Sequence, residues 1–344
     1  MSRVFIHGIG AVSPAGWNVC SLRQALDSGA PIPASPLERP GWKRPLLVRR
    51  VPQPIPKLPH LAHARLRRTS PMSIYAAAAG MEALQNGGYS PVPGHRLGVI
   101  FCVTAGCVQY TRRFYDEAWR NPPGASPLLF PETVFNAPGS HFGAILESSA
   151  VNYTLVGDPG TFLQALALAA GWLEDGKADS CLVVGAEEVD WLTADAYRHF
   201  AKGVVCGEGA GAVYLSGKFP NEGEGIELIA ITEPGLYLNG MSRTEAIRKV
   251  RSALPPAGAA AILSDSIASW PSRDRDELAA WADWKGARIS PRVVLGEGLM
   301  AAGAWQSVAA LDHLRAGRHR TAFVSIAGGH QQAIGACFSM STNG

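Results

Sequence analysis

Short apolar runs alternate along the chain with longer runs rich in alanine and leucine, a pattern typical of α/β proteins. Each short run borders a glycine-containing turn, and we expect buried parallel strands at 4–6, 97–101, 181–184 and 212–215. Between them, Ser70-Pro71 opens an apolar run that stops at Gly87-Gly88. This arrangement predicts a helix with Ser70 as its N-cap and Pro71 at its first position.

The pattern restarts after a segment near residue 220 that contains glycine and glutamate. We expect a strand at 226–230, a helix at 245–254, and strands at 259–263, 293–295 and 322–324. The chain therefore divides into two α/β halves, residues 1–220 and 221–344.

Nine prolines fall within residues 31–60. Proline fixes φ and cannot donate a backbone hydrogen bond, so we expect an ordered surface excursion without regular structure. We expect this excursion to wrap the N-terminal half.

The composition excludes several classes of protein. Hydrophobic residues make up 47% and charged residues 17% of the 344 residues, which excludes a disordered chain. The net charge of +3 is too balanced for a protein that coats nucleic acid or an anionic membrane. No apolar stretch is long enough for a membrane span and no signal-peptide pattern opens the chain, so we expect a cytoplasmic protein. The six cysteines form no CxxC pair, which indicates a reducing compartment rather than disulfides or a zinc site.

Gly8 and Gly10 follow the first strand and start like a dinucleotide-binding fingerprint. Ser13 stands where the third glycine belongs, and Pro14 interrupts the helix start. We therefore expect a tight strand-to-loop turn here rather than a nucleotide site.

Residues 152–166 predict a strand that turns sharply into a long apolar helix. Such a turn aims a side chain at a helix N-terminus, where free N–H groups and the helix dipole stabilise a thiolate or an oxyanion. Asp158 and Pro159 occupy this turn, so the position suited to a nucleophilic side chain carries neither a thiol nor a hydroxyl group. The structural interpretation explains both residues: Asp158 caps the first turn and Pro159 takes the first helical position.

Three segments, in matching order and spacing, resemble the β-ketoacyl-[acyl carrier protein] synthase family: IHGIGAVSPAG at 6–16, FPETVFNAP at 130–138 and GEGAGA at 207–212. The resemblance covers nearly the whole chain and is strongest over residues 1–216. It implies the thiolase fold, an α/β architecture of two duplicated βαβαβαββ halves in a layered αβαβα arrangement.

Active members of this family carry a cysteine at the sharp turn before the central helix, which we call the elbow. Two histidines from the C-terminal half polarise the thioester and drive the decarboxylation of malonyl-carrier protein. The resemblance places Pro159, Ser266 and Glu297 at these three positions. Proline has no nucleophilic side chain, serine is not basic at neutral pH, and an ionised glutamate repels a developing oxyanion. All three catalytic groups are therefore missing, and Val204 stands in place of the family's gating phenylalanine.

A ketosynthase-like chain without these groups resembles a chain length factor, the non-catalytic subunit of a heterodimeric ketosynthase. The resemblance implies two partners, an active ketosynthase and a phosphopantetheinylated acyl carrier protein. We expect no cofactor, no metal ion and no binding to nucleic acid or membrane. We also expect the chain to be inactive on its own. The implied role is control of acyl chain length in the biosynthesis of polyenes such as aryl polyenes, of polyketides or of fatty-acid-like products.

Val108, Thr111 and Tyr115 lie at i, i+3 and i+7 of a predicted helix, and therefore on one face. The resemblance implies that this face closes the acyl tunnel, so that the bulk of its side chains sets product length. A buried core stripe is the alternative, since such periodicity normally indicates burial.

The segment 130–142 is aromatic and carries little charge, which suits an obligate interface. The resemblance implies a dimer interface formed by Phe130, Phe135, Pro138 and Phe142. Ordinary core is the alternative. Basic clusters at 49–50, 65–68 and 315–320 are candidate contacts for an acidic carrier protein, or simply solvated faces.

Two other functions are consistent with the sequence. A divergent acyl transferase or malonyl-carrier-protein decarboxylase would use Cys206 or Glu297 in a rearranged site. Cys206 has no histidine beside it in the sequence, so we interpret it as an inert buried cysteine. A homodimeric protein of the thiolase fold would bind acyl groups without performing chemistry on them.

Overall fold

The computed structural model describes residues 3–53, 55–147, 151–220, 223–237, 242–258, 260–329 and 331–342. Within them, a sheet of 11 strands runs through the molecule in the order β12-β11-β13-β14-β9-β1-β8-β6-β4-β5, and β10 pairs with β14. The N-terminal half contributes β1 (Phe5–Val12), β4 (Leu97–Val103), β5 (Asn152–Val156), β6 (Ser180–Glu187) and β8 (Gly209–Ser216). The C-terminal half contributes β9 (Glu224–Ile231), β10 (Gly235–Leu236), β11 (Ile262–Ser264), β12 (Ala287–Ile289), β13 (Thr321–Ala327) and β14 (Gln332–Thr342).

The two halves repeat one topology. In each half the main strands lie in the order third, second, fourth, fifth, first, which gives β5-β4-β6-β8-β1 and β12-β11-β13-β14-β9. The halves join through their first strands, because Phe5 and Ile6 of β1 pair antiparallel with Glu227 and Ile226 of β9. The duplicated βαβαβαββ halves that the resemblance implies are confirmed.

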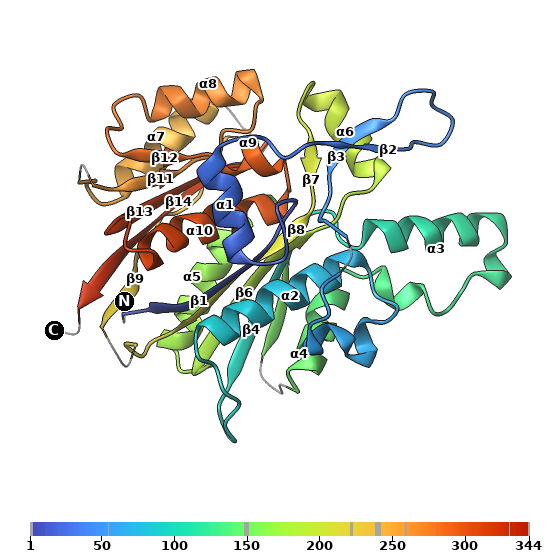
Figure 1. Ribbon diagram of the computed structural model, residues 1–344, viewed down its shortest axis with the longest axis horizontal. Coiled ribbons are helices and arrows are strands. Elements are labelled where there is room, and N and C mark those ends of the chain that lie inside the picture. Colours follow the sequence, from blue (N-terminus) through green and yellow to red (C-terminus); the bar gives the residue numbers. More distant parts are fainter. Residues whose placement is uncertain are drawn as a thin grey trace.

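The helices form three layers around the strands (Figure 1). On the outer faces lie α2 (Pro71–Asn86) and α4 (Ala137–Ile145) in the N-terminal half, and α7 (Arg243–Ala253) and α8 (Pro271–Ala280) in the C-terminal half. Between the halves lie α5 (Thr161–Glu174) and α10 (Met300–Arg315), which contact strands of both. This is the expected αβαβα arrangement. The remaining α-helices of the described residues are α1 (Val19–Ser28), α3 (Val108–Arg120), α6 (Trp191–Phe200) and α9 (Pro291–Leu295).

The close packing of α2 on β1 depends on two glycines. A Cβ added to Gly8 would lie 1.8 Å from the carbonyl oxygen of Ala83, and one added to Gly10 would lie 1.9 Å from that of Ala79. Any side chain at either position would therefore push the helix away from the strand. β1 continues through Val12, and the expected tight turn follows directly, where Ser13 and Gly16 exchange backbone hydrogen bonds of 2.8 and 2.9 Å.

The predicted helix at Ser70 is confirmed. The Ser70 side chain accepts a hydrogen bond from the Met72 N–H, Pro71 is the first helical residue, and the helix ends at Asn86, with Gly87 as its C-cap. Ser70 therefore satisfies one of the free N–H groups at the helix start, as its N-cap position predicts.

Two predictions about strands are wrong. β8 pairs antiparallel with both β1 and β6, so the strand at 212–215 runs opposite to the other three, while β1 runs in the same direction as β4, β5 and β6. Strands covered on both faces are uniformly apolar in either direction, so their composition does not reveal orientation. Residues 293–295 belong to the short helix α9, which starts at Pro291. Ala259, where we expected a strand to begin, lies outside the described residues.

The proline-rich excursion contains more regular structure than predicted. β2 (Ser35–Leu37) and β3 (Leu46–Arg49) form a small sheet with β7 (Cys206–Gly207), and a 3-10 helix spans Pro59–Ala62. Proline is tolerated in β2 because this strand is an edge strand. The excursion contacts both halves, since the Ile32 N–H donates to the Val294 carbonyl. Pro54 lies outside the described residues.

Candidate functional site

The three positions assigned by the resemblance meet at the N-terminal half of α10, and we call this region the α10 site. The carbonyl oxygen of Pro159 lies 2.2 Å from the Cβ position that Gly303 would need, so the elbow rests directly on the helix. Gln306, one turn later, lies within 3.4 Å of the Ser266 hydroxyl. Glu297 stands three residues before the helix begins.

The elbow before α5 is a closed turn. Pro159 is buried, and Asp158 Oδ1 accepts hydrogen bonds from the Gly160 N–H at 2.9 Å and from Gln332 Nε2 at 2.8 Å. Asp158 therefore bonds the N–H of the residue just before the helix. The helix α5 begins at Thr161, with Gly160 as its N-cap and no side-chain cap, so the prediction of Pro159 as the first helical residue is wrong. Burial raises the pKa of its carboxyl group. The turn presents the pyrrolidine ring of Pro159 in place of a nucleophile.

Ser266 is fixed by its neighbours. Its Oγ donates to the Ser325 carbonyl at 2.8 Å and accepts from the Ala327 N–H at 2.8 Å. The only hydroxyl proton is thus committed to the backbone of β13. A hydroxyl held in this way ties the end of β11 to β13 and has no proton free for acid–base chemistry.

Glu297 forms a buried ion pair. Glu297 is 3% and Arg292 is 4% exposed, and Arg292 Nη1 lies 3.2 Å from Glu297 Oε2. The second carboxylate oxygen accepts the Leu299 N–H at 2.9 Å. Arg292 Nε also donates to Gln306 Oε1 at 3.1 Å, which links this pair to the side chain that contacts Ser266.

Cys206 lies beside this pair, because its backbone bridges that of Glu297. Burial, reinforced by the charge of Glu297, raises the pKa of the Cys206 thiol to about 12. The thiol therefore stays protonated at neutral pH, and a protonated thiol is a poor nucleophile. The interpretation of Cys206 as an inert buried cysteine agrees with this environment.

The helix that carries Val108, Thr111 and Tyr115 projects from the body of the protein (Figure 1). None of the residues of α3 is buried, and Tyr115 is 63% exposed. The alternative of a core stripe is therefore wrong. Trp119, 78% exposed, stacks on Tyr115 with ring centroids 6.2 Å apart. Sequence reasoning missed Trp119, although its i+4 spacing from Tyr115 continues the same face.

Polar contacts hold the first turns of α3 to the segment after β6. Glu188 Oε1 accepts the Gln109 N–H at 2.8 Å, and Arg112 Nη2 donates to Asp190 Oδ2 at 3.0 Å. Glu187 accepts the backbone N–H groups of residues 104–106. These acidic side chains hold the start of α3 in place, and nothing in the local sequence pattern identified them.

The four residues of the implied interface separate into two groups. Phe130 and Phe135 are exposed. Pro138 and Phe142 are buried, and the Phe142 ring packs against Gly80 of α2. The prediction is wrong for Pro138 and Phe142, because an aromatic, weakly charged segment suits a core as well as an interface.

Other exposed apolar side chains accompany Phe130 and Phe135. They extend over α3, the segment 128–135 and β5, which lies at the end of the sheet, and we call this region the α3–β5 surface: Tyr115, Trp119, Leu128, Phe130, Val134, Phe135, Tyr153 and Val156. Exposed apolar side chains gathered on a few neighbouring elements indicate an interaction site.

Internal partners occupy most of the basic clusters. Arg49 donates to the carbonyls of Ile32 and Val293, and Arg315 donates to that of His7. Arg318 and Arg320 form ion pairs with Asp27 and Glu224. The arginines that are exposed in the remaining cluster are Arg65, Arg67 and Arg68.

Neither a metal centre nor a membrane-crossing helix emerges from the described residues. No group of three or more His, Cys, Asp or Glu side chains in this part of the chain is placed to hold a metal ion. No described helix combines the length and apolar character needed to cross a bilayer.

Comparisons with known proteins agree with this architecture. The chain matches no curated protein. It superposes on "The ishigamide ketosynthase/chain length factor" with a TM-score of 0.83 and 21% identity, covering 99% of this chain and 100% of that chain. It superposes on a chain of the ketosynthase ApeO in complex with its chain length factor ApeC from Xenorhabdus doucetiae with a TM-score of 0.78, 15% identity, and coverage of 99% and 98%.

A third similar structure contains a type II polyketide synthase acyl carrier protein in complex with its ketosynthase, with a TM-score of 0.75, 15% identity, and coverage of 98% and 99%. At these identities the superpositions establish the fold, which is thiolase-like. Residues 1–218 match the model of the β-ketoacyl synthase N-terminal domain. Since this match spans more than half of the chain, the protein belongs to the β-ketoacyl synthase family.

Proposed function

We propose that the protein is a non-catalytic subunit of the chain length factor type, which pairs with an active ketosynthase and shapes the acyl tunnel of the pair. The observation that carries the proposal is the chemistry of the α10 site. Its three assigned positions hold a proline, a serine with a committed proton and a glutamate neutralised by Arg292. None of these groups supplies a nucleophile or a neutral base that polarises a thioester.

The α3–β5 surface supports the proposed pairing. β5 has a strand neighbour on one side only within the described residues, and its Tyr153 and Val156 are exposed. An exposed sheet edge beside exposed aromatic side chains is covered in stable assemblies. An obligate interface of this kind buries on the order of 2,000 Å² or more. We assign this surface to the contact with the active ketosynthase.

The position of α3 supports the proposed control of chain length. Val108 is half-buried, whereas Thr111, Tyr115 and Trp119 are exposed, so these side chains are free to meet a partner. In the proposed pair they reach the end of the partner's tunnel, where their volume limits the acyl chain. The exposed Arg65, Arg67 and Arg68 are the proposed contacts for an acidic acyl carrier protein. Polyketides, polyenes such as aryl polyenes and fatty-acid-like chains are the candidate products.

Co-expression with a cognate ketosynthase that retains its cysteine and two histidines tests the proposed pairing. Size-exclusion chromatography with light scattering should give a heterodimer containing one copy of each chain. The double variant Phe135→Ser with Tyr153→Ser should weaken the heterodimer, whereas Leu278→Ser, at an exposed apolar residue of α8, should leave it intact. A stable monomer or homodimer that ignores the ketosynthase contradicts the proposal.

Intact-mass spectrometry tests the absence of catalysis separately. After incubation with acyl- and malonyl-carrier protein, the isolated chain should carry no acyl adduct, because burial keeps Cys206 protonated. It should release no carbon dioxide, because Ser266 and Glu297 stand where the two histidines would polarise the thioester. A stoichiometric acyl adduct that disappears in Cys206→Ala would instead establish the divergent acyl transferase.

A further inference from the structure

The two helices of the central layer differ in how much of their surface is covered. Each follows the third main strand of its half: α5 follows β5, and α10 follows β12 after the short helix α9. Nearly every residue of α10 is buried, because α1, α9 and strands of both halves pack on it. The helix α5 packs on α10 and on strands of both halves, yet one of its sides remains accessible to solvent. Two equivalent helices are therefore covered to different extents.

The accessible side of α5 is mostly apolar. We call it the α5 face, and its members recur with helical spacing: Gln164, Ala167, Leu168, Ala170, Gly171 and Glu174. Glu174, the last residue of α5, is the only charged residue of this helix. A helix that is apolar on all sides is normally buried on all sides. The α5 face therefore lacks a cover that the described part of this chain does not supply.

A groove lies between the α5 face and β9, and we call it the α5–β9 groove. Its volume is about 530 Å³, and most of its lining is aliphatic. Ile229 lines this groove and is 43% exposed. Its neighbours Leu228 and Ala230 pair with adjacent residues of β14, so Ile229 is the extra residue of a β-bulge. The groove thus offers room for an apolar side chain next to Ile229.

The α5 face continues the α3–β5 surface. Tyr153 of β5 packs edge to face on Trp172 of α5, with ring centroids 5.0 Å apart. Tyr153 belongs to the α3–β5 surface, and Leu168, one turn before Trp172, belongs to the α5 face. The exposed end of the sheet and the uncovered side of the central helix are neighbours, so one partner can cover both.

A partner with the same fold brings an equivalent helix to this place. Two chains of one fold that join through the same edge strand are related by an approximate two-fold axis, which brings equivalent surfaces together. If the ketosynthase joins at β5, the helix that follows its own edge strand meets the α5 face. The short side chains of Ala167, Ala170 and Gly171 allow two helix axes to approach closely.

Charge favours a different chain over a second copy of this one. The rim of the groove carries the carboxylates of Glu174 and Glu233. The guanidinium of Arg3 is paired with Glu227 at 2.9 Å and does not balance them. A second copy would bring the same carboxylates to a two-fold contact, where like charges repel. A ketosynthase with basic side chains at this place would instead be attracted.

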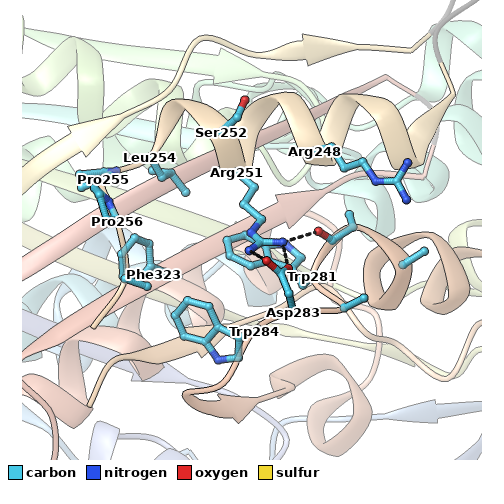
Figure 2. A pocket seen from close by; sticks show the side chains of 14 residues that line it. Arg248, Arg251, Ser252, Leu254, Pro255, Pro256, Trp281, Asp283, Trp284 and Phe323 are labelled. Atoms are coloured by element: carbon cyan, nitrogen blue, oxygen red, sulfur yellow. Dashed lines mark hydrogen bonds and ion pairs between the residues drawn. The ribbon is translucent and has the colours of Figure 1, made fainter. Parts of the chain in front are cut away.

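A hollow on the outer side of the C-terminal half shows the opposite situation (Figure 2). There Trp281 is buried, and the guanidinium carbon of Arg251 lies 5.2 Å from the centre of its ring. Arg251 in turn donates to Asp283 Oδ2 at 2.6 Å. The chain itself covers the Trp281 ring, so the exposed Ala279 beside this hollow is a suitable control position.

We propose that the interface with the active ketosynthase extends from the α3–β5 surface over the α5 face and into the α5–β9 groove. The partner's helix equivalent to α5 packs on the short side chains of this face, and an apolar side chain of the partner fills the groove beside Ile229. This inference rests on the proposed pairing, because it assigns a second surface to the same partner. It explains why α5, unlike α10, is left partly uncovered by its own chain.

Two arginine variants of exposed alanines test the proposal. Ala167→Arg places a charge on the α5 face and should raise the dissociation constant of the heterodimer about tenfold or more, since the contact would bury that charge. Ala279→Arg on α8 is the matched control and should pair like the unchanged chain. Sedimentation velocity over a dilution series with the cognate ketosynthase measures the dissociation constants, and thermal melts confirm that both variants fold.

Hydroxyl-radical footprinting tests the same contact without any substitution. Ile229 and Leu278 are 43% and 49% exposed, so both should be oxidised in the isolated chain. In the heterodimer the oxidation of Ile229 should fall severalfold, whereas that of Leu278 should stay unchanged.

The possible results separate this inference from the proposed pairing. A heterodimer in which Ile229 stays as reactive as in the isolated chain, or equal dissociation constants for the two arginine variants, would overturn the inference and leave the pairing standing. Failure of the unchanged chain to pair would overturn both. A homodimer of the isolated chain that Ala167→Arg disrupts would assign the α5 face to a second copy, and would also overturn the inference.

Discussion

Glu297 and Arg292 depend on each other because both are buried. Each has lost most of its hydration, and their contact at 3.2 Å replaces it only while both are present. Removing one member leaves an uncompensated charge inside the protein, which destabilises the fold more than the pair itself stabilises it. The pairing with Arg292 therefore gives Glu297 a structural role at a position where the family's active members have a catalytic histidine.

Glu297→Gln should therefore lower the free energy of unfolding by about 3 kcal/mol, since it strands the Arg292 charge. Urea unfolding followed by circular dichroism measures this change. Asp27→Asn, which removes the partner of the exposed Arg318, is the control and should change stability very little. Equal effects of the two substitutions would contradict the burial of the Arg292–Glu297 pair.

Buried carboxyl groups around α3 should make stability depend on pH. Burial raises the pKa of Glu187 to about 8 from 4.5, against the opposing hydrogen bonds of Thr104 and Ala105. Between these two values the folded protein binds a proton that the unfolded chain releases, so the free energy of unfolding falls as pH rises. The slope for one group is at most about 1.4 kcal/mol per pH unit. Glu188 and Glu82, with pKa values raised to about 7 by burial, act in the same direction.

In thermal melts from pH 5 to 8, the midpoint of Glu187→Gln should fall less with rising pH than that of the original chain, because the substitution removes one group that releases its proton on unfolding. Glu38→Gln, at an exposed position, should reproduce the original slope. Identical slopes in the original chain and in Glu187→Gln would show that Glu187 does not hold its proton in this range.

At the scale of elements, local signals predict helices better than strand directions. Ser70 and Gly87 mark both ends of α2 in the sequence. Ser242 and Glu245 form a capping box that starts α7 two residues before the predicted helix, a signal that the apolar pattern alone overlooked. The segment 293–295 is too short for its period to separate strand from helix, so its assignment as a strand was wrong.

Glycines decide how closely elements approach each other. Gly10→Ala should destabilise the protein by about 3 kcal/mol or more, because its Cβ would lie 1.9 Å from the Ala79 carbonyl oxygen in α2. Gly171→Ala in α5 should instead stabilise it by about 0.5–1 kcal/mol, since nothing lies within 4 Å of the new Cβ and alanine favours the helix. Opposite shifts in the thermal midpoint are the expected result, and a shared sign would contradict this account of α2 packing.

At the scale of the whole molecule, the sequence predicts which residues far apart in the chain lie close together in the fold. It does not predict which apolar residues are exposed. The family pattern placed Pro159, Ser266 and Glu297 together, and the α10 site brings them together. The same pattern did not separate the exposed Phe135 from the buried Phe142, because both positions are apolar in a chain that has both a core and an interface. Only tertiary packing distinguishes the two residues: the Phe142 ring packs against Gly80 of α2.

Because the side chains of α3 are exposed, substitutions there should change product length without changing the stability of the fold. Tyr115 is 63% exposed, so Tyr115→Ala should change the free energy of unfolding by no more than about 0.5 kcal/mol. In a reconstituted pair with the active ketosynthase, the smaller side chain should leave more room at the tunnel end and lengthen the products by whole extension units. Thr111→Phe should shorten them by filling the same space. Arg113→Gln, off this face of α3, should alter neither property, and product masses that stay unchanged in both Tyr115→Ala and Thr111→Phe would exclude α3 from control of chain length.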